Sequence, residues 1–145
     1  MATTIKKVDY FYCSVEDHPG EAYKLLSFLA KVGVYLHAFC VVPTGPSHTQ
    51  FTLFPEDSLK LIAEAKKANL NLTGPNPAFL IQGDDEIGAL VEIHQKLYEA
   101  DINVYSSNAV TDGKGSFGYV LYVGPEQFKR AAEALELWGF RNFCI

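Results

Sequence analysis

Residues 8–20 read VDYFYCSVEDHPG, and they open a pattern that the chain uses twice. Val8 to Val15 is rich in β-branched and aromatic residues and is apolar at nearly every position, which predicts a central strand. Glu16 to Gly20 breaks that strand. From Glu21 to Val32 the apolar residues recur at three- and four-residue spacing, which predicts a helix with one buried face. Gly33 stands where a helix C-cap belongs.

The rest of the first half completes a compact pattern of strands and helices. Val34 to Val42 is again strand-like, and Pro43 to Ser47 contains two prolines and a glycine, which predict a turn. Gln50 to Phe54 alternates apolar and polar residues and is expected to return as the hairpin partner. Ser58 to Ala68 is predicted to be a second helix, with acidic residues at its start. Leu70 to Leu72 is expected to supply a short closing strand.

The second half repeats this order at an offset of about 68 residues, and such repeats decide the fold. The expected elements are strands at 79–81, 104–110 and 119–123, helices at 89–100 and 125–138, a loop at 83–88, a turn at 111–115 and a possible final strand at 140–145. The offset pairs Gly20 with Gly88, Leu29 with Leu97, Val34 with Ile102, Phe51 with Tyr119, and Leu53 with Leu121. Pro55 and Glu56 then match Pro125 and Glu126 after a slip of two residues, at a turn where insertions are tolerated.

Each half therefore predicts the order β-α-β-β-α-β, a ferredoxin-like α+β arrangement in which two helices cover one face of an antiparallel sheet. The expected modules are residues 1–74 and 75–145, joined at Thr73 to Pro77. A module of about seventy residues is near the lower limit for independent stability. We therefore expect each module to pack on its sister or on another subunit, with a homodimer as the expected assembly.

Composition excludes several classes of protein. Hydrophobic residues make up 48% and charged residues 20% of the 145 residues, which is ordinary for a globular protein. The formal charge of -5 and the scattered basic residues argue against nucleic-acid binding. No apolar run predicts a signal peptide or a membrane span, so we expect a cytoplasmic protein. The three cysteines and four histidines lack metal-ligand spacing, and we expect no metal and no cofactor.

The segment Asp17-His18-Pro19-Gly20-Glu21-Ala22, with its helix and then Gly33-Val34-Tyr35-Leu36, resembles the signature of ACT domains. The second half resembles it as Asp85-Glu86-Ile87-Gly88-Ala89-Leu90, followed by Ala100-Asp101-Ile102-Asn103-Val104. The resemblance covers nearly the whole chain, twice. It implies a non-catalytic regulatory protein that binds a small ligand, usually an amino acid, between modules and acts on an enzyme partner.

The resemblance also implies where the ligand binds. Backbone N–H groups at the start of the first helix would hold its carboxylate, because a helix N-terminus has unpaired donors and a partial positive charge. Glycine at that point lets the backbone approach the ligand closely. The predicted binding residues are Asp17, His18 and Gly20 in the first half and Asp85, Glu86, Ile87, Gly88 and Asn103 in the second. The halves are unequal, so one of them is expected to bind and the other to serve as a scaffold.

Simpler explanations exist for the same residues. Asp17 and Asp85 are also typical N-cap residues, which accept a backbone N–H without any ligand. His18 beside Asp17 resembles an acid–base pair, but a surface histidine is the favoured interpretation, since no nucleophile accompanies it. Gly113-Lys114-Gly115 lacks the spacing of a phosphate loop and is expected to be a hairpin turn.

Two other kinds of protein share the predicted topology. RNA-recognition modules use aromatic residues on the sheet, but the acidic charge and the missing basic-aromatic pattern argue against them, and the aromatic residues here are expected to pack in the sheet. Acylphosphatase carries an arginine-bearing phosphate loop after its first strand, where this chain has Glu16-Asp17 and Asp84-Asp85-Glu86, which would repel phosphate. The preferred hypothesis is an amino-acid-binding regulatory protein. The alternative is a structural or interaction module without a ligand.

Overall fold

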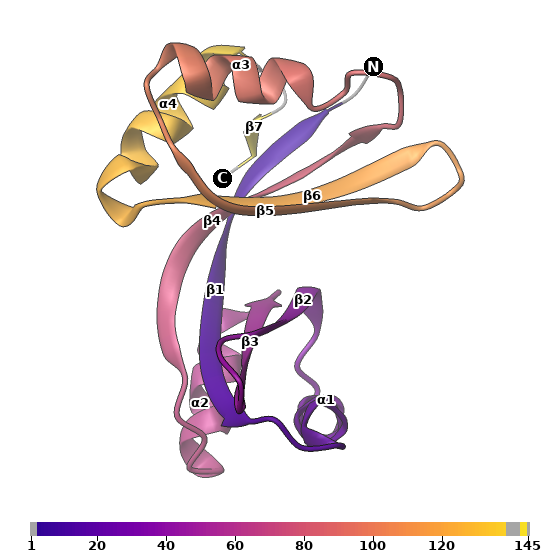
Figure 1. Ribbon diagram of the computed structural model, residues 1–145, viewed down its shortest axis with the longest axis vertical. Coiled ribbons are helices and arrows are strands. Elements are labelled where there is room, and N and C mark those ends of the chain that lie inside the picture. The colour runs from indigo at the N-terminus through magenta and orange to yellow at the C-terminus, as the bar shows by residue number, and fades with distance from the viewer. Residues whose placement is uncertain (1–2, 139–142, 145) are drawn as a thin grey trace. The chain divides into compact units, whose positions relative to one another are not determined.

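The computed structural model of the protein describes residues 3–138 and 143–144 and shows a mixed α+β fold (Figure 1). Its strands are β1 (Thr4–Glu16), β2 (Leu36–Pro43), β3 (His48–Pro55), β4 (Thr73–Asp84), β5 (Val104–Thr111), β6 (Ser116–Val123) and β7 (Phe143–Cys144). Its helices are α1 (Glu21–Lys31), α2 (Ser58–Lys67), α3 (Val91–Glu99) and α4 (Phe128–Trp138), with a short 3₁₀ turn η1 (Pro125–Gln127) before α4.

The chain divides into two compact units. The first unit is Asp9–Asn76, and the second unit combines Met1–Val8 with Pro77–Ile145. Strands β1 and β4 therefore each run through both units. The N-terminal segment was expected in the first module, and its place in the second unit has a physical reason: Ile5 is completely buried in the second unit's core.

The two units repeat the same strand registers at the offset that the sequence predicts. In the first unit Phe11 pairs with Leu53 across antiparallel strands, and in the second Phe79 pairs with Leu121. The pairing of β2 with β3 is irregular between Leu36 and Ala38, and that of β5 with β6 is irregular 68 residues later, between Val104 and Ser106. The internal repeat is thus present in the hydrogen-bonded geometry as well as in residue types.

The first unit orders its strands β2-β3-β1-β4, with α1 and α2 against one face. Its core contains Phe11, Cys13, Leu25, Leu29, Val34, Phe51, Leu53 and Leu61. Helix α1 begins after Gly20, whose φ of 91° is left-handed, and α2 begins after Asp57, whose carboxylate accepts a hydrogen bond from the Lys60 N–H. The helices bury one apolar face each, as the spacing predicts.

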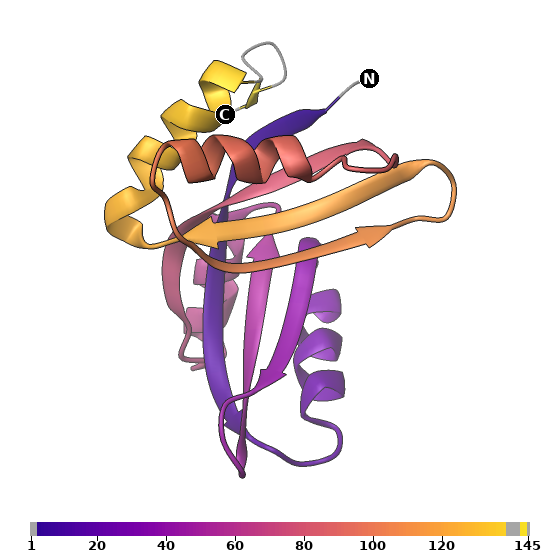
Figure 2. The same cartoon turned by 45° about the horizontal axis from the view of Figure 1, so that its top comes forward.

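The second unit orders its strands β5-β6-β4-β1, and β7 pairs in parallel with β1. Helices α3 and α4 lie side by side over one face of β4 and β6, and β5 and β6 form a hairpin (Figure 2). The core combines Ile5 with Phe79, Ile81, Ile93, Leu97, Ile102, Phe117, Tyr119, Leu121, Val123, Ala131 and Leu135. Packing in this core confirms the expected role of its aromatic residues. Strands β2 and β5 end the strand order and leave one edge each without a neighbour in the described chain.

The expected joint, Thr73 to Pro77, contains the boundary between the two units and lies within strand β4, because proline and the residue before it both favour extended backbone at the start of a strand. Two expected elements differ from the structure. Leu70 to Leu72 is not a strand. Helix α3 begins at Val91 instead of Ala89, since turns at Glu86 and Gly88 precede it. Of the expected strand 140–145, only Phe143–Cys144 lies within the described residues.

Candidate functional site

The loop between β4 and α3 is held in a tight conformation by backbone hydrogen bonds. The Asp85 N–H donates to the Gly115 carbonyl at 2.8 Å, and the N–H groups of Ala89 and Val91 donate to the Glu86 and Gly88 carbonyls. Gly88 has a φ of 80°, in the left-handed region that favours glycine. Within the described residues, the N–H groups of Gly88 and Leu90 have no acceptor in this loop. They are available to an anionic group.

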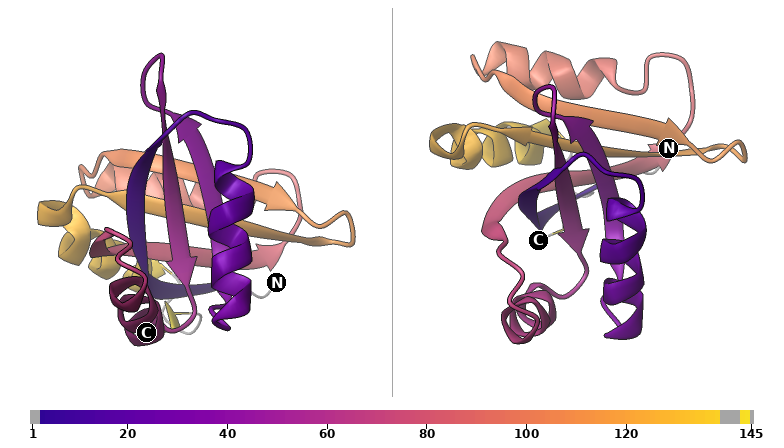
Figure 3. Two further views of the ribbon diagram at one scale, coloured as in Figure 1. Left: turned by 90° about the horizontal axis from the view of Figure 1, so that it is seen from below. Right: turned by 60° about the horizontal axis from the view of Figure 1, so that its bottom comes forward.

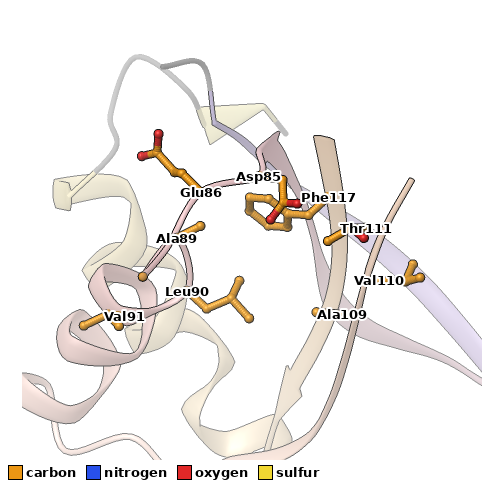
Figure 4. A pocket seen from close by; sticks show the side chains of 10 residues that line it. Asp85, Glu86, Ala89, Leu90, Val91, Ala109, Val110, Thr111 and Phe117 are labelled. Carbon is orange, nitrogen blue, oxygen red and sulfur yellow. The ribbon is translucent and has the colours of Figure 1, made fainter. Parts of the chain in front are cut away.

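A pocket of about 360 Å³ lies between this loop and the β5–β6 hairpin (Figure 4). Its volume falls within the usual range of ligand pockets. The loop and the start of α3 contribute one wall, and the ends of β5 and β6 contribute the other; Phe117 is buried between them. The lining residues are Asp85, Glu86, Gly88, Ala89, Leu90, Val91, Ala109, Val110, Thr111 and Phe117.

The charge of this pocket is negative. Asp85 and Glu86 line it, and none of its lining residues is basic. In Figure 4 the Asp85 carboxylate lies beside the Phe117 ring, whereas the Glu86 side chain points away from the other residues. The rest of the lining is mostly apolar. A small ligand with a cationic group and an apolar part is the chemistry that such a pocket favours.

The corresponding loop of the first unit has the same backbone geometry. The Asp17 N–H donates to the Ser47 carbonyl at 2.8 Å, 68 residues before the Asp85–Gly115 bond. The strand that faces this loop differs, because Val41 stands where the second unit has Ala109. The first unit also has a bulkier residue at the next position on that face, where Phe39 replaces Ser107 and lies 5.8 Å from Phe51 between ring centroids. At two other lining positions the second unit has the larger residue, since Leu90 matches Ala22 and Phe117 matches Thr49, so the two loops differ in which wall is bulky.

Three polar residues join α3 to the sheet next to the pocket. His94 Nε2 lies 2.6 Å from the Tyr119 hydroxyl, which also forms a hydrogen bond with the Ser107 side chain. Burial raises the pKa of Tyr119, and its hydrogen bond with Ser107 acts in the opposite direction. The matching residues of the first unit, Leu26, Phe51 and Phe39, are all apolar. At these three positions the second unit therefore has hydrogen-bonded polar residues where the first unit has apolar ones.

The structure brings together some of the predicted binding residues. Asp85, Glu86 and Gly88 line the pocket, whereas Ile87 is fully exposed and does not. Asn103 directly precedes β5, whereas the pocket residue Ala109 lies near the other end of the same strand. Six residues of extended chain separate the two by roughly 20 Å. The Asn103 backbone N–H donates to Gln127 Oε1 at 3.2 Å.

The predicted residues of the first unit are all exposed, and the structure tests all three of the simpler explanations. The N-cap of α1 is Gly20 and that of α3 is Leu90, and neither forms a side-chain cap, so Asp17 and Asp85 are not N-caps. His18 lies 2.9 Å from Glu16 on the surface instead of pairing with Asp17. Gly113 to Gly115 forms the turn of the β5–β6 hairpin, as expected.

The sequence analysis missed the half of the pocket that comes from β5 and β6. Ala109, Val110, Thr111 and Phe117 had not been assigned to the pocket, and neither had Ala89, Leu90 and Val91 at the start of α3. A signal was present, because the loop after the first strand lies next to the hairpin turn in any βαββ unit of this kind. The hydrogen bond from the Asp85 N–H to the Gly115 carbonyl joins this loop directly to the hairpin turn.

Among the described residues, no group of three or more His, Cys, Asp or Glu side chains is placed to hold a metal ion. None of the helices in this part of the chain has the length and apolar character needed to cross a membrane.

Comparison with known proteins identifies the fold. No protein-family model and no curated protein matches the chain. Among solved structures, protein BT0572 from Bacteroides thetaiotaomicron is similar, with a TM-score of 0.77 and 15% identity over 94% of this chain and 90% of that chain. The regulatory subunits of aspartate kinase from Thermus thermophilus and Thermus flavus match with TM-scores of 0.63 and 0.61, at 12% and 13% identity, over 94% of this chain and 96% of theirs. At such identities the chain shares a fold with these regulatory subunits.

Proposed function

We propose that this chain is a regulatory protein of two ACT-type modules that binds a small zwitterion, an amino acid, in the pocket of the second unit. The observation that carries the proposal is the pocket itself, which lies at the loop that the ACT resemblance designates. The likeness in fold to regulatory subunits of aspartate kinase supports it. We further propose that the modules follow the two compact units, with residues 1–8 completing the second.

The pocket offers a partner for each part of an amino acid. The free N–H groups of Gly88 and Leu90 would donate to its carboxylate at the start of α3, where the helix dipole favours an anion. The Asp85 carboxylate would accept from its ammonium group. The apolar wall of Leu90, Val110 and neighbouring residues would hold its side chain. The first unit would serve as the scaffold.

Regulation requires that the ligand favour one of two states. By linkage, the ligand shifts such an equilibrium by no more than its differential affinity for the two states. The pocket joins the start of α3 to the edge strand β5, so binding there would alter that edge. We propose that β5 or β2 contacts a second copy of the chain or a regulated enzyme, and that the chain itself catalyses no reaction.

The second candidate is an interaction module without a ligand. The observation that favours it is the exposure of apolar residues on the edge strand β5, where Tyr105 and Val110 are 60% and 72% exposed. An unpaired strand edge with apolar side chains is a template for pairing with another chain.

Calorimetric titration with each of the twenty amino acids tests the proposal. We expect one amino acid, or a few related ones, to bind to the wild-type chain, and Asp85→Ala to weaken that binding while Asp17→Ala leaves it unchanged. If no amino acid binds to the wild-type chain, the ligand proposal is wrong, and self-association measured by sedimentation then tests the interaction module. Equal effects of the two variants would contradict the assignment to the second unit.

A further inference from the structure

A second pocket lies inside the first unit, between α1 and α2. The two helices approach each other where α1 ends, since a Cβ added at Gly33 would lie 3.0 Å from Lys60 Nζ on α2. Figure 3 shows α1 and α2 apart from each other in both views. A pocket of about 300 Å³ lies at the other end of the space between the two helices, between the N-terminal half of α1 and the end of α2. We call this space the wedge. Its pocket is separate from the pocket of the second unit.

The sequence places a small residue at this end of the first unit. Counted from Pro55 and its counterpart Pro125, 70 residues later, Ala68 corresponds to Trp138. The small residue thus stands at the end of α2 and lines the pocket. In the second unit the helices α3 and α4 pack directly against each other.

The lining of the pocket is apolar inside and charged at its mouth. Val15, Leu25, Phe28, Phe51, Ala68 and Leu70 form the apolar part, together with the Cys13 side chain. Burial raises the pKa of the Cys13 thiol, so the pocket holds a neutral thiol and no charge inside. Glu21 and Lys24, on successive turns of α1, also line the pocket, and Lys24 Nζ lies 3.2 Å from Glu21 Oε2.

The ion pair at the mouth presents both signs of charge to a ligand. The Lys24 side chain is 72% exposed, and an ion pair so exposed contributes little and can rearrange at little cost. A carboxylate and an ammonium on one small molecule would match Lys24 and Glu21 respectively. A ring or a branched aliphatic group on the same molecule would fill the apolar wedge, whose volume is at the lower end for ligand pockets.

We propose that this wedge between α1 and α2 is a second small-molecule site, which binds an amino acid with an apolar side chain, aromatic or branched. The zwitterionic head lies between Glu21 and Lys24, and the side chain lies over Cys13 and Phe51. The inference does not depend on the function proposed for the second unit.

Alkylation of Cys13 by iodoacetamide, followed at the peptide level by mass spectrometry, tests occupancy of the wedge. L-phenylalanine and L-leucine serve as probes. At ten times the dissociation constant, we expect a bound probe to slow the alkylation of Cys13 about tenfold. Cys40, which lies on β2 and does not line the pocket, is the internal control and should react at an unchanged rate. Unchanged alkylation of Cys13 with both probes at saturating concentrations would overturn the proposal.

Charge and shape are tested separately. Phenethylamine lacks the carboxylate and 3-phenylpropionate lacks the ammonium, and each should bind about tenfold more weakly than L-phenylalanine or worse. Equal affinity of all three would refute the role of Glu21 and Lys24. Ala68→Trp should abolish protection of Cys13 by filling the wedge; if this variant does not fold, Ala68→Leu and Lys24→Met replace it. Asp85→Ala should leave the protection unchanged, and a loss of protection in that variant would place the probe in the second unit instead.

Discussion

Gly88 is the residue whose replacement tests both the loop geometry and its role in binding. Its φ of 80° is left-handed, and an added Cβ would meet only Val91 Cγ2, at an ordinary distance of 3.8 Å. The cost of Gly88→Ala is therefore conformational instead of steric. A left-handed residue with a Cβ costs roughly 1–2 kcal/mol, which corresponds to a fall of about 3 to 6 °C in the melting temperature of a chain of this size.

Gly20→Ala is the matched control, because Gly20 has a φ of 91° and an added Cβ there would meet nothing within 4 Å. Both variants should lose about the same free energy of unfolding in urea denaturation. Only Gly88→Ala should also weaken ligand binding, by about tenfold in the dissociation constant, because it displaces N–H donors of the pocket. Calorimetric titration measures this difference. No loss of stability in Gly88→Ala would refute the strain argument, and equal losses of affinity in both variants would refute the assignment of the site to the second unit.

Three further substitutions test the fold around the site. Ile5→Ala should destabilise the chain by about 2–5 kcal/mol in urea denaturation, because Ile5 is completely buried; a loss below about 1 kcal/mol would contradict the place of residues 1–8 in that core. Asp57→Ala should cost about 1 kcal/mol through its lost N-cap, whereas Asp85→Ala should cost almost nothing; an equal cost would mean that Asp85 caps α3 after all. Tyr119→Phe should cost about 0.5–1.5 kcal/mol by removing the hydroxyl that His94 contacts at 2.6 Å, and an unchanged melting curve would show that this hydrogen bond is not stabilising.

The repeat made most of the fold predictable. Leu29 and Leu97, or Leu53 and Leu121, could be matched by residue type alone. The structure buries the first pair in α1 and α3 and gives the second pair corresponding strand registers. The grouping of residues 1–8 with the second unit was not predictable. The residue pattern indicates that Ile5 is buried, but it does not indicate in which of the two cores. The prolines at 75 and 77 suggested a joint, and the boundary between the units does fall there, but their preferred backbone is also that of a strand, so no separate linker forms.

The candidate site was predictable where it is local and not where it depends on distant parts of the chain. Asp85 and Gly88 follow directly from the loop after β4. Ala109 and Phe117 enter the pocket because the hairpin folds over that loop, which only the pairing of β5 with β6 establishes. Asn103 was grouped with the loop through the family resemblance, yet it lies at the opposite end of β5.

Nuclear magnetic resonance of the ¹⁵N-labelled chain, titrated with the amino acid that binds in calorimetry, tests the central claim most directly. We expect the amide signals of residues 85–91 and 109–111 to shift together and to saturate at the calorimetric affinity, while those of residues 17–23 and 41–43 stay in place. Shifts confined to the first unit's loop, or no shifts at either loop, would contradict the claim that the second unit holds the regulatory ligand.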